Sequence, residues 1–252
     1  MLCFNCQTKV ICYSSQLSRN LSFSLKRSIN LEHKNALCTW TGGHESSLTL
    51  LHALKNYTVK CLVTPTVESD FNTFHLQLLP PSILRAQADL IKQPLLILNT
   101  SYNEYESAFS QALNSLKKHK MNTLIFSTIR HNLAKQSLEN LCHNLGIKSY
   151  FPLWERYEEG LLSEFLEMGF KAKIIAVNEK FLTRDFLGKD LDKDVIEEFR
   201  QRKIDLFGEN GEYQTLLYEA PFFSEPLQIK EGDINLRNGN WTLDVTLNSS
   251  LN

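Results

Sequence analysis

The chain has 252 residues, of which 42% are hydrophobic, enough to bury the core of one large or two modest domains. Its formal net charge of −1 at pH 7 gives no overall attraction for a polyanion, so direct binding to nucleic acid is not expected. No apolar run approaches the length of a membrane span.

The first 34 residues form a serine-rich segment with a net charge of +4, whereas the rest of the chain carries −5. This segment has no acidic residue before Glu32, a composition typical of an organelle transit peptide. An unstructured leader, or a start codon placed too early, is the alternative. We therefore expect a cytoplasmic protein, with mitochondrial targeting through residues 1–34 as the second possibility.

The cysteines indicate a reducing compartment and no disulfide framework. Cys3-x2-Cys6 followed by Cys12 resembles a set of metal ligands, but no fourth ligand is obvious nearby, and we predict no metal site built from these residues. Cys38, Cys61 and Cys142 lie in apolar stretches and are expected to be small core residues.

Between residues 36 and 148, short apolar runs alternate with segments whose apolar residues recur at helical spacing. Continuously apolar strands separated by helices indicate an α/β fold, a twisted parallel sheet with helices on both faces. Ligands of such sheets bind at the carboxyl ends of the strands. The predicted strands are 36–40, 59–63, 95–98 and 123–127, and the predicted helices are 46–55, 82–91, 104–119 and 138–145, the last ended by Gly146.

From Ser149 onward the pattern changes, and we predict a second, smaller α/β unit packed against the first. Its predicted strands are 149–153, 172–177 and 214–219, its helices are 158–168 and 194–203, and two more strands, 227–230 and 241–247, lie in a tail. These boundaries divide the chain into segments 1–34, 35–148, 149–223 and 224–252.

A loop containing two glycines, Thr41-Gly42-Gly43-His44-Glu45-Ser46, joins the first predicted strand to its helix. Glycines let backbone N–H groups approach an anion, and the helix N-terminus adds the positive end of its dipole. The hydroxyls of Thr41 and Ser46 can donate to phosphate oxygens, although Ser46 can equally cap the helix. The spacing is neither that of a Walker loop nor Gly-x-Gly-x-x-Gly. We predict a phosphate-binding loop, with an ordinary capped turn as the alternative.

A second loop, Gly208-Glu209-Asn210-Gly211-Glu212-Tyr213-Gln214-Thr215, carries two carboxylates and leads directly into the apolar run 216–218. Gly208 and Gly211 permit tight turns, so we expect the loop to aim Glu209 and Glu212 in one direction. A surface turn rarely combines two acids and a tyrosine with a buried strand. We interpret this loop as functional.

Several segments, in this order along the chain, resemble the diphthine–ammonia ligase family, ATP-dependent amide ligases built on the adenine-nucleotide alpha-hydrolase (PP-loop) fold, which is Rossmann-like. The family's Ser-Gly-Gly-Lys-Asp-Ser loop corresponds to residues 41–46, and its Gly-Glu-Gly-Gly-Glu-Tyr-Glu-Thr corresponds to residues 208–215. Between them, Phe74-His75 matches a Phe-His pair, Pro152-Leu153-Trp154-Glu155-Arg156 matches Pro-Leu-Trp-Gly-Arg, and Leu187-Gly188-Lys189-Asp190-Leu191-Asp192 matches Leu-Gly-Arg-Asp-Leu-Asp. The likeness extends from about residue 35 to residue 223.

This resemblance implies that a carboxylate attacks the α-phosphate of ATP, releasing pyrophosphate, and that ammonia converts the acyl-adenylate to an amide. ATP and Mg²⁺ would be the cofactors. The partners would be ammonium and either diphthine on translation elongation factor 2 or another carboxylate acceptor. Residues 35–148 would be the nucleotide-binding domain and 149–223 the substrate-binding subdomain. In this interpretation Glu209 and Glu212 are catalytic, Thr41, Gly42, Gly43, His44, Glu45 and Ser46 bind nucleotide, and His75, Glu139, Trp154, Arg156, Gly208, Gly211 and Tyr213 bind substrate.

The chain departs from the family where nucleotide would be handled. His44 stands in place of the loop lysine, and an imidazole is mostly neutral near pH 7. The family stretch Ser-Asp-Tyr-Gln-Arg-x-Arg reads His131-Asn132-Leu133-Ala134-Lys135-Gln136-Ser137 here, so two cations become one. A family member that binds nucleotide or substrate without turnover is therefore the alternative function. An unrelated α/β nucleotide or cofactor binder is the third.

Three of the substrate-binding residues also admit simpler interpretations. His75 can be a hydrogen-bonded loop histidine, Trp154 can pack between the two units and offer no face to a quaternary ammonium, and Arg156 can form a solvated ion pair. Ligase chemistry requires that the Gly42–Gly43 turn and the loop around Glu212 face each other.

Overall fold

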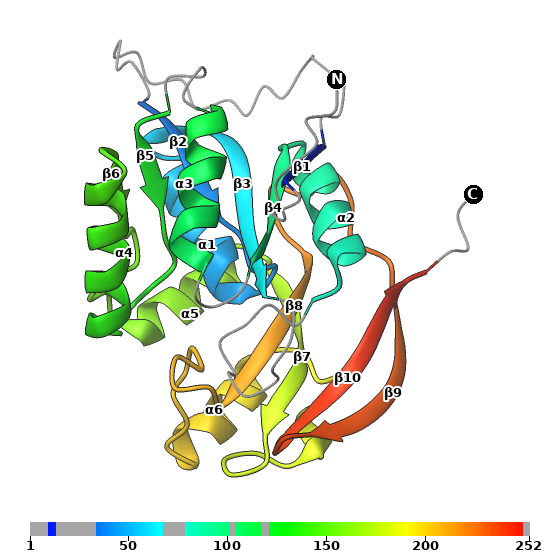
Figure 1. The fold of residues 1–252 in the computed structure, drawn as a ribbon. Coiled ribbons are helices and arrows are strands. Elements are labelled where there is room, and N and C mark those ends of the chain that lie inside the picture. The colour runs from blue at the N-terminus through cyan, green and yellow to red at the C-terminus, as the bar shows by residue number, and fades with distance from the viewer. Residues whose placement is uncertain (1–9, 14–33, 68–78, 101–103, 117–120, 249–252) are drawn as a thin grey trace.

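The computed structural model describes residues 10–13, 34–67, 79–100, 104–116 and 121–248. The larger of its two sheets has six strands in the order β1-β4-β3-β2-β5-β6 (Figure 1). Five strands run parallel, and β1 pairs antiparallel with β4 at one edge. Their bounds are β1 Val10–Tyr13, β2 Lys34–Thr39, β3 Tyr57–Val67, β4 Leu95–Thr100, β5 Thr123–Ile125 and β6 Lys148–Tyr150.

Helices cover both faces of this sheet, as predicted. Side chains of β2 alternate between the faces, because Ala36 and Cys38 belong to one apolar cluster and Leu37 to another. The first cluster includes residues of α1 and α2, and the second includes residues of α3 and α4. The four helices are α1 His44–Ala53, α2 Pro81–Ile91, α3 Tyr105–Leu116 and α4 Asn132–Asn144.

The strand order places a topological switch point at β2. From β2 the chain builds the sheet in one direction through β3 and β4, and it then crosses over to add β5 on the other side of β2. Open α/β sheets bind ligands in the crevice beyond the carboxyl ends of the strands at such a point. The loops that follow β2 and β5 therefore form the expected site.

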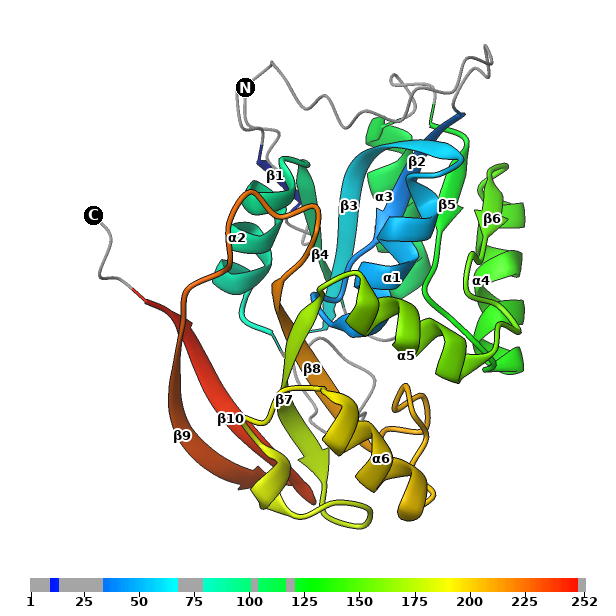
Figure 2. The same ribbon diagram turned by 180° about the vertical axis from the view of Figure 1, so that it is seen from behind.

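The second sheet has four antiparallel strands in the order β8-β7-β10-β9. It lies beyond the carboxyl ends of the first sheet's strands (Figures 1 and 2). Apolar side chains such as Ile174 and Leu216 belong to the same cluster as those of α1 and α2, so one core continues from the first sheet into the second. The elements are α5 Glu158–Glu167, β7 Lys171–Asn178, the 3₁₀ turn Arg184–Phe186, α6 Lys193–Gln201, β8 Tyr213–Glu219, β9 Ile229–Arg237 and β10 Asn240–Leu247.

Four strands differ from the sequence prediction. β1 lies inside the segment interpreted as a leader; its residues favour strands, but a four-residue run gives a weak signal. β6 pairs with β5, so the strand predicted to open the second unit lies at the edge of the first sheet. β9 and β10, predicted as a separate tail, join the second sheet through the pairing of β10 with β7. A strand's partner depends on tertiary contacts that local sequence does not reveal.

Other predictions concern single residues and the termini. Cys38, Cys61 and Cys142 are buried in the apolar core, as predicted. Residues 1–9 and 14–33 lie outside the described residues, so the targeting function and the role of Cys3 and Cys6 stay predictions. None of the described helices is both long enough and apolar enough to cross a bilayer.

Candidate functional site

The glycine loop after β2 contacts β8 directly. The Gly42 carbonyl accepts a hydrogen bond from the Leu217 N–H at 2.8 Å, and the His44 N–H donates to Thr215 Oγ1 at 3.1 Å. A Cβ on Gly43 would lie 3.0 Å from the Thr215 carbonyl oxygen, so a larger residue at this close approach would require β8 to shift. The two loops therefore face each other as expected, although they are packed together and not separated by an open cleft.

A buried glutamine of α2 fixes the loop from the other side. Gln87 Nε2 donates to the carbonyls of Gly42 and Leu217 at 3.0 and 2.7 Å, and Gln87 Oε1 accepts from the Trp40 indole at 3.0 Å. Gly42 has φ 79°, and a Cβ there would lie 2.5 Å from Gln87 Oε1. Gln87 was not identified from the sequence, although a polar residue on the apolar face of α2 could have indicated its buried role.

The side chain of His44 is buried between the two units. Its Nδ1 lies 2.8 Å from Thr215 Oγ1, and its Nε2 lies 3.5 Å from Tyr213 Oη. The ring stacks on Phe207 and on Tyr213, with centroids 5.1 and 5.7 Å away. Burial lowers the pKa of His44 to about 4, opposed by the nearby Asp205 carboxylate. The imidazole is therefore neutral at pH 7 and packs the interface between the units.

The remaining side chains of the loop divide into one that is buried and two that are accessible. Ser46 is fully buried and donates to the Gly43 carbonyl at 3.1 Å, and Gly43, not Ser46, is the N-cap of α1. Thr41 is exposed and Glu45 is partly buried. Burial, with smaller effects of Glu209 and Asp205, raises the pKa of Glu45 well above its usual value. Glu45 therefore lies close to Glu209 and Asp205.

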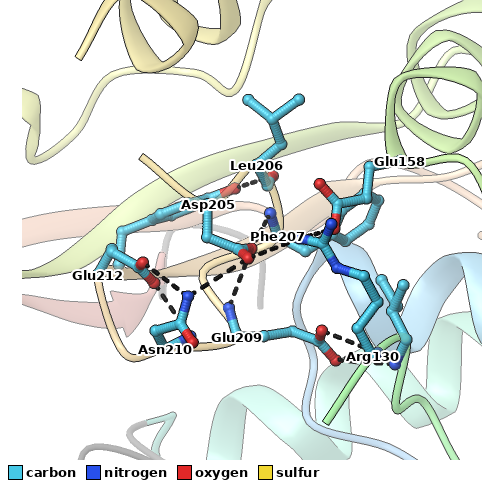
Figure 3. Close-up of polar contacts among 10 residues, drawn as sticks. Arg130, Glu158, Asp205, Leu206, Phe207, Glu209, Asn210 and Glu212 are labelled. Carbon is cyan, nitrogen blue, oxygen red and sulfur yellow. Dashed lines mark hydrogen bonds and ion pairs between the residues drawn. The ribbon is translucent and has the colours of Figure 1, made fainter. Parts of the chain in front are cut away.

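The two glutamates of the second loop have different partners (Figure 3). Glu209 accepts from the backbone N–H of Ile129 at 2.8 Å and from that of Arg130 at 3.0 and 3.2 Å. Glu212 is buried and accepts from the N–H and the Nδ2 of Asn210, both at 3.1 Å. The two carboxylates therefore have separate partners, because Glu209 accepts from the loop after β5 and Glu212 accepts from Asn210 in its own loop. The expectation that both point the same way stays a prediction.

The turns of this loop follow the prediction, while its tyrosine does not lie where a ligand could reach it. Gly208 and Gly211 have φ 67° and 84°, the left-handed region that favours glycine. Tyr213 is buried, and its hydroxyl donates to the Leu206 carbonyl at 2.6 Å. Tyr213 therefore supports the loop from within the core.

Three charged residues that were not predicted as site residues, Arg130, Glu158 and Asp205, complete the cluster in Figure 3. Arg130 Nη2 contacts a Glu158 carboxylate oxygen and lies 3.0 Å from Asp205 Oδ2. Asp205 Oδ1 accepts from the N–H groups of Phe207 and Glu209 at 2.9 and 3.3 Å. Burial is the main cause that raises the pKa of Glu158 and of Glu209. Arg130 directly precedes the 131–137 stretch and Asp205 lies just before the second loop, and these positions were the sequence signals that could have identified them.

A cavity of about 300 Å³ opens at this cluster, between the loop after β5 and the loop before β8. Arg130, Asp205, Glu209 and Asn210 line it, together with residues 131–133. The loop after β5 is one of the two at the switch point. Of the predicted site residues, Glu209 therefore lies in the wall of a cavity at the position that the fold favours.

The predicted substrate-binding residues separate into two groups. Trp154 and Glu139 meet at Lys135, whose Nζ lies 5.0 Å from the Trp154 ring centroid and 2.5 Å from Glu139 Oε1. Arg156 instead lies 3.5 Å from Glu164 and 2.7 Å from Nε2 of His52, about two turns along α1 from the glycine loop. His75 lies outside the described residues.

A doubly wound α/β sheet with a glycine loop at its switch point defines a Rossmann-like nucleotide-binding fold. Within this class, residues 34–149 match the family "Diphthamide synthase N-terminal domain" and residues 157–249 match "Diphthamide synthase C-terminal domain". The chain belongs to the diphthamide synthase family. The first matched segment ends within β6 and the second begins at Tyr157, which agrees with the place of β6 in the first sheet.

Curated relatives carry the name diphthine–ammonia ligase. The chain is 29% identical over 140 residues to that of Schizosaccharomyces pombe, covering 54% of this chain and 23% of the relative. It is 28% identical over 122 residues to the human protein, covering 47% of this chain and 46% of the relative. It is 25% identical over 223 residues to that of Saccharomyces cerevisiae, covering 73% of this chain and 32% of the relative. The aligned parts thus span less than half the length of each of these relatives.

Proposed function

We propose that this chain is an ATP-dependent amide ligase of the diphthine–ammonia type. The observation that carries the proposal is the junction of the two loops. The Gly42 carbonyl and the His44 N–H bond to β8, immediately after the acidic loop, and Glu209 of that loop lines the cavity at the switch point. Membership of the diphthamide synthase family supports the same reaction class.

The reaction divides into two displacements. An acceptor carboxylate oxygen attacks the α-phosphorus of ATP, the bond from that phosphorus to the pyrophosphate oxygen breaks, and an acyl-adenylate forms. Ammonia then attacks the acyl carbon, the bond to the AMP oxygen breaks, and an amide remains with one proton released. The acceptor is diphthine on translation elongation factor 2 or another carboxylate.

The acidic cluster suits the second displacement. Carboxylates near the cavity favour ammonium, which must lose a proton before its nitrogen can attack. Burial raises the pKa of Glu209, and a raised pKa makes a carboxylate a better acceptor for that proton. Glu209 also holds the amides of Ile129 and Arg130, which fixes the cavity wall.

The residues present also fit Mg²⁺, which nucleotide sites hold with one or two carboxylates plus substrate phosphates. In the described part of the chain no group of three or more His, Cys, Asp or Glu is arranged to hold a metal ion by itself. Glu45, partly buried at the glycine loop, supplies a carboxylate suited to the shared mode. Bound there, Mg²⁺ would neutralise charge on the phosphates.

One observation favours a second candidate, binding of nucleotide without turnover. His44 occupies the position of the family lysine, and its neutral ring is buried against Phe207 and Tyr213. The loop therefore offers a phosphate its backbone but no cationic side chain of its own.

Product analysis separates the two candidates. The full chain is incubated with Mg-ATP, ammonium and elongation factor 2 that carries unamidated diphthine, and nucleotides are resolved by ³¹P NMR. We expect AMP and pyrophosphate that depend on ammonium, together with an amidated acceptor by mass spectrometry. Formation of ADP and phosphate would contradict the proposal. Calorimetric binding of Mg-ATP without AMP would favour the second candidate.

A further inference from the structure

The proposed function requires a positively charged side chain to bind the polyphosphate, and the glycine loop does not provide one. A nucleoside triphosphate brings three to four negative charges, and phosphate sites normally meet them with Lys or Arg side chains as well as backbone amides. The accessible side chains of the glycine loop are Thr41 and the acid Glu45, and the His44 ring is buried against Phe207 and Tyr213. A cation must come from another element if this site holds a polyphosphate.

Arg130 lies where such a cation is needed. It follows β5, the strand that pairs with β2 on the far side of the switch point, and it lines the cavity. Its side chain is 53% exposed although two carboxylates contact it. Within the described residues its guanidinium bonds all use Nη2, so Nε and Nη1 keep their donors for a ligand in the cavity.

The acids around Arg130 make its charge decisive. Asp205 and Glu209 line the same cavity, and Glu158 contacts the guanidinium. Without Arg130 this wall would carry negative charge alone and would repel phosphate. The two carboxylates fix the guanidinium, and Glu209 fixes the backbone of the same residue through its N–H. Such a preorganised planar fork matches phosphate oxygens well.

We infer that Arg130 is the phosphate-binding cation of this site. It supplies the positive charge that His44, the fourth residue of the glycine loop, does not supply. The inference rests on the proposed function, since it concerns the polyphosphate of the same substrate. It assigns a binding role to a residue outside every motif on which the family resemblance was based.

The test measures binding of Mg-pyrophosphate to the full chain by calorimetry. Arg130→Gln should weaken binding by about 10- to 150-fold, the worth of a charge-assisted hydrogen bond. Arg130→Lys, which keeps the charge but loses the fork, should restore part of that loss. Arg200→Gln is the matched control, because Arg200 is 39% exposed and also pairs with two carboxylates, Glu159 and Glu197, away from the cavity. It should bind as the wild type does.

The outcomes distinguish this inference from the function on which it rests. If the wild type does not bind Mg-pyrophosphate or Mg-ATP, the proposed function and the inference both fail. If the wild type binds and folded Arg130→Gln binds equally well, or if Arg200→Gln loses as much affinity, only the inference about Arg130 is overturned. A loss in Arg130→Gln that Arg130→Lys does not recover at all would show that charge is not the cause, and it would overturn the inference as well.

Discussion

The Thr215 hydroxyl contacts His44 twice, accepting from its backbone N–H at 3.1 Å and lying 2.8 Å from its Nδ1. A hydroxyl that accepts the backbone bond can donate its own hydrogen to Nδ1. This arrangement suits the neutral imidazole with its hydrogen on Nε2. Thr215, a residue of the second sheet, thus fixes both the backbone and the imidazole ring of His44.

The buried neutral ring predicts acid sensitivity. The pKa of His44 falls from 6.5 to about 4 on folding, so below pH 6.5 the unfolded chain binds a proton that the native chain does not. Stability from this residue is therefore complete above pH 6.5 and is lost as the pH falls toward 4. Between pH 8 and pH 5 we expect a loss of about 2 kcal/mol in the free energy of unfolding.

Denaturant titrations of the wild type and His44→Gln at both pH values measure this loss. The variant lacks the titrating group, so its stability should change by about 2 kcal/mol less than that of the wild type. Equal changes in the two proteins would show that the ring does not titrate as inferred.

Local pattern was enough to predict strands β2 to β5 of the first sheet and the two loops, because both depend on short-range properties. Apolar runs and helical spacing indicated strands 36–40 and 59–63 and the helices between strands, and Gly42 and Gly211 marked turns. The carboxyl ends of the strands then predicted where the loops gather.

The chemistry of individual side chains was not available from local pattern. His44 was interpreted as a phosphate ligand, but the partners that bury it, Phe207 and Thr215, lie more than 160 residues away in the chain. Asp205 and Arg130 belong to loops 75 residues apart and become a pair only in the folded chain. Such roles depend on tertiary contacts, which spacing does not encode.

Glu45 should reduce the stability of the unliganded protein at alkaline pH. Burial and its acidic neighbours raise its pKa well above the usual value, so the unfolded chain releases this proton at a lower pH than the native chain does. Its contribution to stability therefore falls as the pH rises through that range. Glu45→Gln should raise the midpoint of thermal unfolding at pH 8 and weaken Mg-ATP binding, a trade typical of functional sites.

The control for this variant is Glu225→Gln, which removes an exposed carboxylate. It should leave both the unfolding midpoint and Mg-ATP binding unchanged. A Glu45→Gln protein that is no more stable than the wild type at pH 8 would show that the carboxylate is accommodated without strain.

Glu209 should hold the loop after β5 in place. Its carboxylate accepts from the backbone N–H groups of Ile129 and Arg130, and hydrogen bonds to charged groups contribute about 1.5–3 kcal/mol each. Glu209→Ala should therefore speed amide exchange at these two positions by about tenfold or more. Exchange at Phe126, whose N–H donates to the Tyr150 carbonyl, should not change. Unchanged exchange at Ile129 and Arg130 would show that the loop is fixed without Glu209.

The contact between Lys135 and Trp154 bears on the proposed substrate. The Lys135 ammonium lies over the Trp154 ring at 5.0 Å and over the Phe151 ring at 5.4 Å, and it thereby occupies the aromatic face proposed for a quaternary ammonium. Removing this internal cation should open the site. Because a cation–π contact is worth about 1–2 kcal/mol, Lys135→Met should bind tetramethylammonium about 5- to 30-fold more tightly than the wild type.

Two further variants make this experiment specific to the Trp154 face. Lys189→Met removes an ammonium that lies 4.7 Å from the Phe186 ring, so it controls for losing a cation–π contact elsewhere, and it should bind tetramethylammonium as the wild type does. Adding Trp154→Leu to Lys135→Met should abolish the gain, because leucine keeps an apolar surface but has no π face. A gain that survives the loss of Trp154 would place the bound cation elsewhere, and no gain in Lys135→Met would mean that the aromatic face does not select a quaternary ammonium.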